Sequence, residues 1–274
     1  MMSIRQRAIA VLAVLLCAAA ASASAQSAPP AFEPEPGRPG KDVLWLPTQH
    51  VLVERMLDIA RVRADDVVYD LGSGDGRTVI AAAQRGARAV GIEYDATLVE
   101  MSKRNAAAAG VADRASFRQA DLFTVDLSEA TVITLFLGNG LNLRLRPTLL
   151  ALAPGTRVVS NTFMMDDWEP DVEINVAEGC EAHYYCRANY WTVPARVEGR
   201  WRMGAETLRL RQKFQKIGGH VLTRGAEIPI TDAVLSGASI RFVADGRRFA
   251  GVVSGDAIEG TAQGAAWKAT RVRP

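Results

Sequence analysis

Apolar and polar residues follow two alternating patterns along the first two thirds of the chain. Short apolar runs predict strands at residues 67–71, 89–93, 116–119, 131–137 and 157–160. Segments with helical spacing lie between them at residues 77–84, 96–109 and 142–152. The nearly continuous apolar run at 131–137 is typical of a strand buried on both faces. Strands that alternate with helices predict an α/β fold with a Rossmann-like, doubly wound sheet.

Three further segments complete this domain, which we place at residues 41–194. Residues 51–60 have helical spacing, with Thr48 as the expected N-cap. Residues 171–178 and 182–193 could form an antiparallel hairpin, with Cys180 and Cys186 near its turn. The two cysteines could form a disulfide in an oxidising compartment, but the sequence leaves this open. With three histidines in the chain, no constellation of metal ligands is evident.

From about residue 195 to residue 274, the pattern changes to short β-like runs separated by glycines. Eleven of the 23 glycines fall in these last 80 residues. The runs predict a small antiparallel β domain, barrel-like in character, with Trp201 and Trp267 expected in its core. Apolar residues alternate with arginine at 208–211 and 240–242, which indicates one buried and one exposed face. The predicted strands are residues 199–203, 207–214, 221–223, 228–235, 239–243, 249–253, 257–262 and 266–272.

The N-terminal residues 1–25 have the pattern of a secretory signal peptide. Arg5 and Arg7 precede an apolar stretch at residues 8–20, and an Ala-Ser-Ala cleavage motif ends at Ala25. We expect export to the periplasm or beyond, with no transmembrane segment after removal of the signal. An uncleaved signal would instead anchor the chain to a membrane. Residues 26–40, which contain many Pro and Gly, are predicted to be a linker.

The charges are balanced overall and unequal between the two domains. Residues 26–194 hold 16 basic and 23 acidic side chains, and residues 195–274 hold 14 and 7. The totals of 30 and 30 do not indicate a nucleic-acid partner. The asymmetry fits attraction between the two domains, or a basic surface for an anionic partner. We favour the first, because the basic residues are spread along strands.

The strongest chemical signal lies between the first strand and the next helix. Glycines let a backbone approach a ligand closely, and N–H groups at a helix N-terminus suit a carboxylate. The two acids here would repel a pyrophosphate, which argues against NAD or FAD, and would attract a cationic ligand. The residues concerned are Asp70, Gly72, Ser73, Gly74, Asp75 and Gly76.

This loop, together with an acid at the end of the second strand, resembles motif I of class I S-adenosylmethionine (SAM)-dependent methyltransferases. The resemblance implies that Glu93 accepts both ribose hydroxyls of SAM, with Tyr94 beside it. It also implies that Asp121 accepts from the adenine amine and that the N–H of Leu122 meets a ring nitrogen. SAM is therefore the expected cofactor.

A narrower resemblance extends from Pro47 to about Trp168, roughly half of the chain without its signal. Residues 137–150, 154–163 and Trp168 are similar to a branch that includes mitochondrial lysine methyltransferases of the ATP synthase c-subunit and the adenine nucleotide translocase. The branch implies a lysine acceptor, although it lacks the predicted export signal and β domain. The end of strand four also lacks the Asp/Asn-Pro-Pro-Tyr of many amine methyltransferases of DNA or glutamine, so we expect no nucleic acid.

The acceptor is predicted to be a protein amine or a small molecule. The sequence assigns no catalytic residue, and His50 is the candidate base, although a solvated role for it is favoured. Two alternatives are a SAM- or nucleoside-binding envelope protein without turnover, and a ligand-binding β domain with a structural Rossmann-like half. The other candidate groups of the acceptor pocket are Thr48, Asn139, Asn161 and Asp167.

Overall fold

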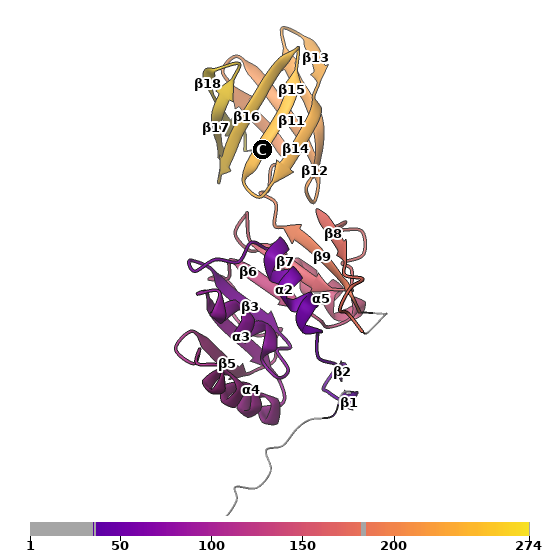
Figure 1. The fold of residues 1–274 in the computed structure, drawn as a ribbon. Coiled ribbons are helices and arrows are strands. Elements are labelled where there is room, and N and C mark those ends of the chain that lie inside the picture. Colours follow the sequence, from indigo (N-terminus) through magenta and orange to yellow (C-terminus); the bar gives the residue numbers. More distant parts are fainter. Residues whose placement is uncertain (1–34, 36, 182–184, 274) are drawn as a thin grey trace, which may run out of the picture. The chain divides into compact units, whose positions relative to one another are not determined.

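The computed structural model describes residues 35, 37–181 and 185–273. The predicted signal peptide and most of the predicted linker lie outside these residues. The described chain forms a seven-stranded mixed sheet, a nine-stranded antiparallel sheet and a short two-stranded hairpin (Figure 1). Within the described residues, no helix is both long and apolar enough to cross a membrane, and no three or more His, Cys, Asp and Glu side chains form a group that could hold a metal ion.

The seven-stranded sheet has the order β5-β4-β3-β6-β7-β9-β8. Its first five strands are parallel, whereas β9 runs antiparallel to both β7 and β8. This is the predicted doubly wound, Rossmann-like sheet closed by an antiparallel hairpin. The strand order reverses between β3 and β6, and ligands bind at such a switch point, outside the carboxyl ends of the strands. The strands are β3 Val67–Leu71, β4 Arg88–Glu93, β5 Ala115–Gln119, β6 Val132–Leu135, β7 Arg157–Asn161, β8 Val172–Asn175 and β9 Arg187–Thr192.

Helices cover both faces of this sheet because alternate strand residues point to opposite sides. Val68 of β3 belongs to a core with α2 His50–Ile59, α3 Arg77–Gln84 and α4 Ala96–Ala108. Its neighbour Tyr69 belongs to the opposite core, with α5 Asn139–Leu149. The two apolar layers fix the sheet and leave its carboxyl edge available for a site.

Several predicted boundaries were wrong, two of them next to the site, and so was one predicted cap. Strand β6 ends at Leu135, because the chain leaves the sheet there, and α5 begins at Asn139 rather than at residue 142. The N-cap of α2 is Gln49 and not Thr48. The hydroxyl of Thr48 instead accepts a hydrogen bond from the amide of Asn161, 3.2 Å away. A tertiary contact therefore uses the hydroxyl that was expected to cap α2.

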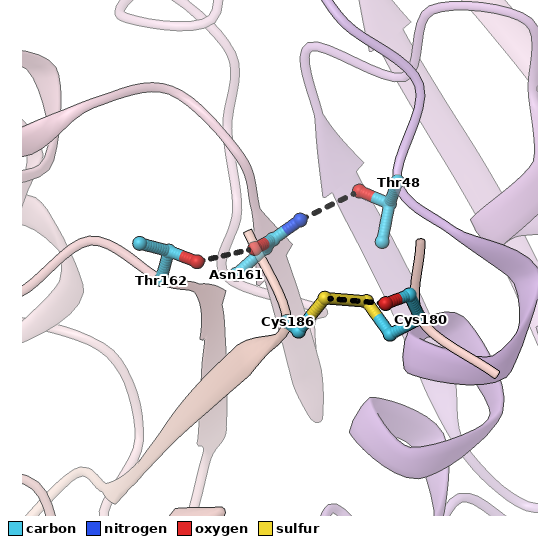
Figure 2. The surroundings of a disulfide bond; sticks show 5 residues. All are labelled: Thr48, Asn161, Thr162, Cys180 and Cys186. Carbon is cyan, nitrogen blue, oxygen red and sulfur yellow. Dashed lines mark hydrogen bonds between the residues drawn. A yellow bond between two sulfur atoms is a disulfide. The ribbon is translucent and has the colours of Figure 1, made fainter. Parts of the chain in front are cut away.

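A disulfide joins Cys180 and Cys186 in the loop between β8 and β9. Strands β8 and β9 pair antiparallel, so the hairpin that was expected from residues 171–178 and 182–193 is present, although β9 begins only at Arg187. Figure 2 draws Thr48 and Asn161 in the surroundings of this disulfide.

The segment before Thr48 is not only a linker. Strand β1 Arg38–Pro39 pairs with β2 Leu44–Trp45, so the end of the predicted linker is part of a small hairpin. A sequence window of a few residues carries too little periodicity to predict such short strands, and the hairpin turns out to line the site described below.

The nine-stranded sheet has the order β13-β12-β11-β10-β18-β17-β16-β15-β14 and a core of its own. The predicted run 228–235 is divided at Ile230 into two strands. Trp201 is fully buried, whereas Trp267 packs edge-on against Phe242 and Phe249 at the margin of the core. The strands are β10 Gly199–Met203, β11 Glu206–Lys213, β12 Lys216–Thr223, β13 Ala226–Pro229, β14 Thr231–Ser236, β15 Ser239–Ala244, β16 Arg247–Ser254, β17 Ala257–Ala262 and β18 Ala265–Arg271.

Charge complementarity between the acidic and basic halves is visible as two ion pairs. Lys213 contacts Asp167 at 3.0 Å, and Lys216 contacts Glu169 at 2.6 Å. Both pairs are exposed, so each contributes at most about 1 kcal/mol. They agree with the interpretation that the two charge excesses attract each other within the chain.

Candidate functional site

A cavity of about 320 Å³ lies at the carboxyl edge of the seven-stranded sheet, beside the switch between β3 and β6. Its walls come from the glycine loop after β3, the ends of β4 and β6, and residues 120–122 after β5. Residues 39–48, which include the β1–β2 hairpin, complete the lining. All ten residues of the predicted cofactor site except Gly76 line this cavity.

The glycine loop has a backbone that side chains would not permit. Gly72, Gly74 and Gly76 all have positive φ, at 79°, 54° and 83°. A Cβ at Gly74 would lie 2.4 Å from the indole nitrogen of Trp45, and one at Gly76 would lie 2.8 Å from the ring of Phe117. The loop therefore needs glycine both for its conformation and for its close packing.

Helix α4 holds the same loop from the other side. The hydroxyl of Ser102 donates to the carbonyl of Gly74 at 2.8 Å, and the amide of Asn105 donates to the carbonyl of Asp75 at 2.9 Å. The sequence analysis missed these two supports. The sequence feature that could have revealed them is the presence of two polar residues on the side of the alanine-rich helix α4 that faces the loop.

Glu93 fixes the loop to the end of β4. Its carboxylate accepts hydrogen bonds from the backbone N–H groups of Gly74, Tyr94 and Asp95, at 2.9, 2.7 and 3.0 Å. These contacts immobilise a negatively charged group at the cavity wall. The remaining lone pairs of the two oxygens can accept from hydroxyls of a bound sugar.

Asp70 is buried at the base of the cavity and is held by Thr134, whose hydroxyl donates to the carboxylate at 2.6 Å. The pKa of Asp70 is raised to about 7, mainly by burial and also by the charges of Glu93 and Asp75, while the hydrogen bond from Thr134 opposes the increase. Near neutral pH the carboxyl group is therefore poised between its two forms. A cation entering the cavity would favour the ionised form.

The charge of Asp75 is already compensated. Its carboxylate receives a forked interaction from Arg77, with the closest contact at 2.5 Å, and Arg77 also donates to the carbonyl of Thr48 at 2.8 Å. Asp75 thus joins the loop to the entry of α2 rather than presenting a free negative charge.

Asp121 is engaged by a residue that the sequence analysis did not single out. The ammonium of Lys41 lies 2.7 Å from one carboxylate oxygen, and the N–H of Phe123 donates to the other at 3.0 Å. Lys41 lowers the pKa of Asp121, with a smaller effect from the Phe123 N–H. Lys41 also lies 4.7 Å from the centre of the exposed Tyr94 ring. An adenine amine that donates to Asp121 must share or displace this contact.

The candidate groups for the acceptor are not gathered in one place. Thr48 lines the cavity and, with the buried Asn161, belongs to a chain of hydrogen bonds that continues to Thr162 (Figure 2). Among the described lining residues, however, neither Asn161 nor the exposed His50 occurs. Of Thr48, Asn161 and His50, Thr48 alone belongs to the described lining of the cavity.

Asn139 and Asp167 are also engaged elsewhere. The amide oxygen of Asn139 accepts from the N–H of Met164 at 3.0 Å. Asp167 is exposed and pairs with Arg146 at 2.6 Å and with Lys213 at 3.0 Å. The structure therefore brings neither residue into the described lining of the cavity.

Comparison with known proteins identifies relatives of this chain. The family model of the ANTKMT methyltransferase domain matches residues 70–172. A protein-lysine N-methyltransferase of Saccharolobus islandicus is 44% identical over 144 residues, which cover 52% of this chain and 89% of that protein. The adenine nucleotide translocase lysine N-methyltransferase of Mus musculus is 38% identical over 120 residues, and this chain spans only 52% of its length.

A solved structure is also similar to part of this chain. The crystal structure of an RNA methyltransferase from Salinibacter ruber, in complex with S-adenosyl-L-homocysteine, shares 48% identity with this chain. The match covers 56% of this chain and 96% of that one, with a TM-score of 0.52. The glycine loop, Glu93 and Asp121 all lie within residues 70–172, which the family model matches.

Proposed function

Because the chain belongs to the SAM-dependent methyltransferase family of the Saccharolobus protein-lysine N-methyltransferase, we propose that it methylates the ε-amine of a lysine in a protein. That it is a class I SAM-dependent methyltransferase follows from the family and from the related structure with S-adenosyl-L-homocysteine. The observation that supports the lysine acceptor is the 44% identity over 89% of a protein-lysine methyltransferase.

The residues of the cavity fit SAM. The turn of the glycine loop leads into the N-terminus of α3, where N–H groups suit a carboxylate. Asp70 can meet a cationic group, and Glu93 can meet the ribose.

SAM supplies an electrophilic methyl group, and the protein supplies position and environment. Methyl transfer to an amine is an in-line displacement, so alignment of the two groups contributes much of the acceleration. The amine must be neutral to attack. Leu135, Phe136 and Leu137 form an apolar wall at the end of β6, which keeps water away from the reacting groups.

The test is transfer of labelled methyl groups from SAM to proteins of a cell-envelope extract and, separately, to RNA. We expect label in protein, recovered as methyl-lysine after acid hydrolysis, and lost when the lysines are acetylated beforehand. At SAM concentrations below its Kd, Glu93→Ala should lower transfer by about tenfold or more, whereas Glu100→Ala, which changes an exposed acid of α4 paired with Lys103, should not. Label in RNA alone would assign the acceptor class of the Salinibacter relative instead, and no label at all would contradict the proposal.

We also propose that the protein is exported. The pattern of residues 1–25 and the disulfide between Cys180 and Cys186 support this, because disulfides persist in oxidising compartments. Sequencing the N-terminus of the protein from an envelope fraction should find Gln26 first. Recovery of an intact N-terminus from the cytoplasmic fraction would contradict export.

A further inference from the structure

A second hollow, of about 470 Å³, adjoins the cofactor cavity. Residues 39–44, together with Leu46, Phe136 and Leu137, line both hollows. The residues particular to the second one are Gly138, Phe163 and Tyr185. The two hollows thus meet at the end of β6.

Three aromatic rings from separate elements meet in the second hollow. Phe136 follows β6, Phe163 follows β7, and Tyr185 belongs to the disulfide loop before β9. The ring centres of Phe136 lie 5.9 Å from Phe163 and 5.3 Å from Tyr185, and those of Phe163 and Tyr185 are 5.9 Å apart. All three side chains are half-buried, so part of each ring remains available to a ligand. We call these three residues the aromatic wall.

We propose that the aromatic wall binds the side chain of the acceptor lysine and its methylated products. This rests on the proposed function. The charged side chains that line the hollow are Lys41, which is paired with Asp121, and Asp42. An apolar stem with a cationic end matches such a lining, because aromatic faces attract cations and cover methylene groups. The three rings contact one another, so the side chain passes across the wall rather than between the rings.

The disulfide holds one member of this wall. Tyr185 directly precedes Cys186, whose bond to Cys180 closes the loop. A short closed loop restricts the positions that Tyr185 can take. The disulfide therefore positions an aromatic side chain for the acceptor in addition to joining the ends of the loop.

The test compares two small probes by NMR titration of the whole chain saturated with S-adenosyl-L-homocysteine. One probe is Nε,Nε-dimethyl-lysine amide, and the other is norleucine amide, which has the same stem without the cation. We expect the cationic probe to bind about 2- to 30-fold more tightly. In Tyr185→Leu and Phe163→Leu this preference should shrink towards one, with SAM affinity unchanged. Phe214→Leu removes a ring that lines neither hollow and should keep the preference.

The outcomes separate this inference from the proposed function. Equal affinity of the two probes, or a preference that survives both wall variants, would overturn the aromatic wall even if methyl-lysine is formed. A preference that depends on the wall would support a cation site even if the envelope proteins yield no methyl-lysine. If both hold, the same variants should raise KM for the protein acceptor more than they lower kcat.

Discussion

SAM is expected to bind more tightly as the pH rises from 5.5 to 7.0, because Asp70 must give up its proton to meet a cationic ligand. Asp70 is buried, and its pKa is raised to about 7, mainly by burial. An approaching ammonium or sulfonium favours the carboxylate over the acid. Binding is therefore coupled to the release of a proton from this one group.

The size of the effect follows from the pKa. With a value of about 7, roughly half of the Asp70 carboxyl groups are ionised at pH 7.0 and about 3% at pH 5.5. When only the ionised form is competent, the apparent Kd scales inversely with that fraction. The Kd should then fall about 16-fold between the two pH values, which corresponds to about 1.6 kcal/mol. Above this range the amino group of SAM itself begins to titrate, so the range stops at pH 7.0.

The assay is calorimetric titration of SAM at several pH values, with buffers of different ionisation enthalpy to count the released protons. Asp70→Asn is the matched variant, because its amide oxygen can still accept from Thr134. This variant should bind weakly and with little dependence on pH. A wild-type Kd that stays constant across the range, or an equal slope in the Asn variant, would refute the role of Asp70.

The remaining predictions concern cofactor affinity and stability. Glu93→Ala should weaken SAM binding at least tenfold by calorimetry, because charge-assisted hydrogen bonds of about 1.5–3 kcal/mol are lost. Gly74→Ala should abolish binding, since its Cβ would meet Trp45 at 2.4 Å, whereas Gly110→Ala, also at positive φ but facing open space, should keep it. Replacing the two cysteines of the disulfide by serine should lower the free energy of unfolding by about 2 kcal/mol in urea titrations, and an unchanged midpoint would contradict this. The stability of the ligand-free protein should change with pH in the direction opposite to SAM binding. The folded pKa of Asp70, about 7, exceeds the unfolded value of about 3.9, so the free energy of unfolding should fall as the pH rises between these two values. Urea titrations at several pH values should show this loss in the wild type and not in Asp70→Asn.

Much of the fold could be predicted because the residues that a strand or helix buries form a pattern within a short stretch of sequence. The continuous apolar runs of β3 and β6 have the pattern that strands covered on both faces require. Alternation at Leu208 and Leu210 likewise indicated a strand with one exposed face, and both residues are buried while Arg209 is exposed. Boundaries were less certain, as at α5, because the end of an element depends on where the chain must turn to reach a tertiary contact.

The site was predicted in part, for a related reason. The residues of the glycine loop are close together in sequence, so their spacing alone indicates the conformation and the ligand. Thr48 illustrates the limit: its sequence position suggested an N-cap, but Asn161, 113 residues away, bonds to its hydroxyl. His50 and Asp167 were candidates only by composition, and they do not line the described cavity.

The sequence by itself determined the order of strands and helices along the chain, the glycine loop, and the acids at the ends of β3, β4 and β5, because each is a local pattern with a local physical cause. The tertiary structure alone decided which side chains meet. It placed Lys41 against Asp121, Arg77 against the carbonyl of Thr48, and Trp45 against Gly74. Phe136, Phe163 and Tyr185 meet only because three separate loops end at the same edge of the sheet. Such contacts depend on the path of the whole chain, and no window of sequence contains that path.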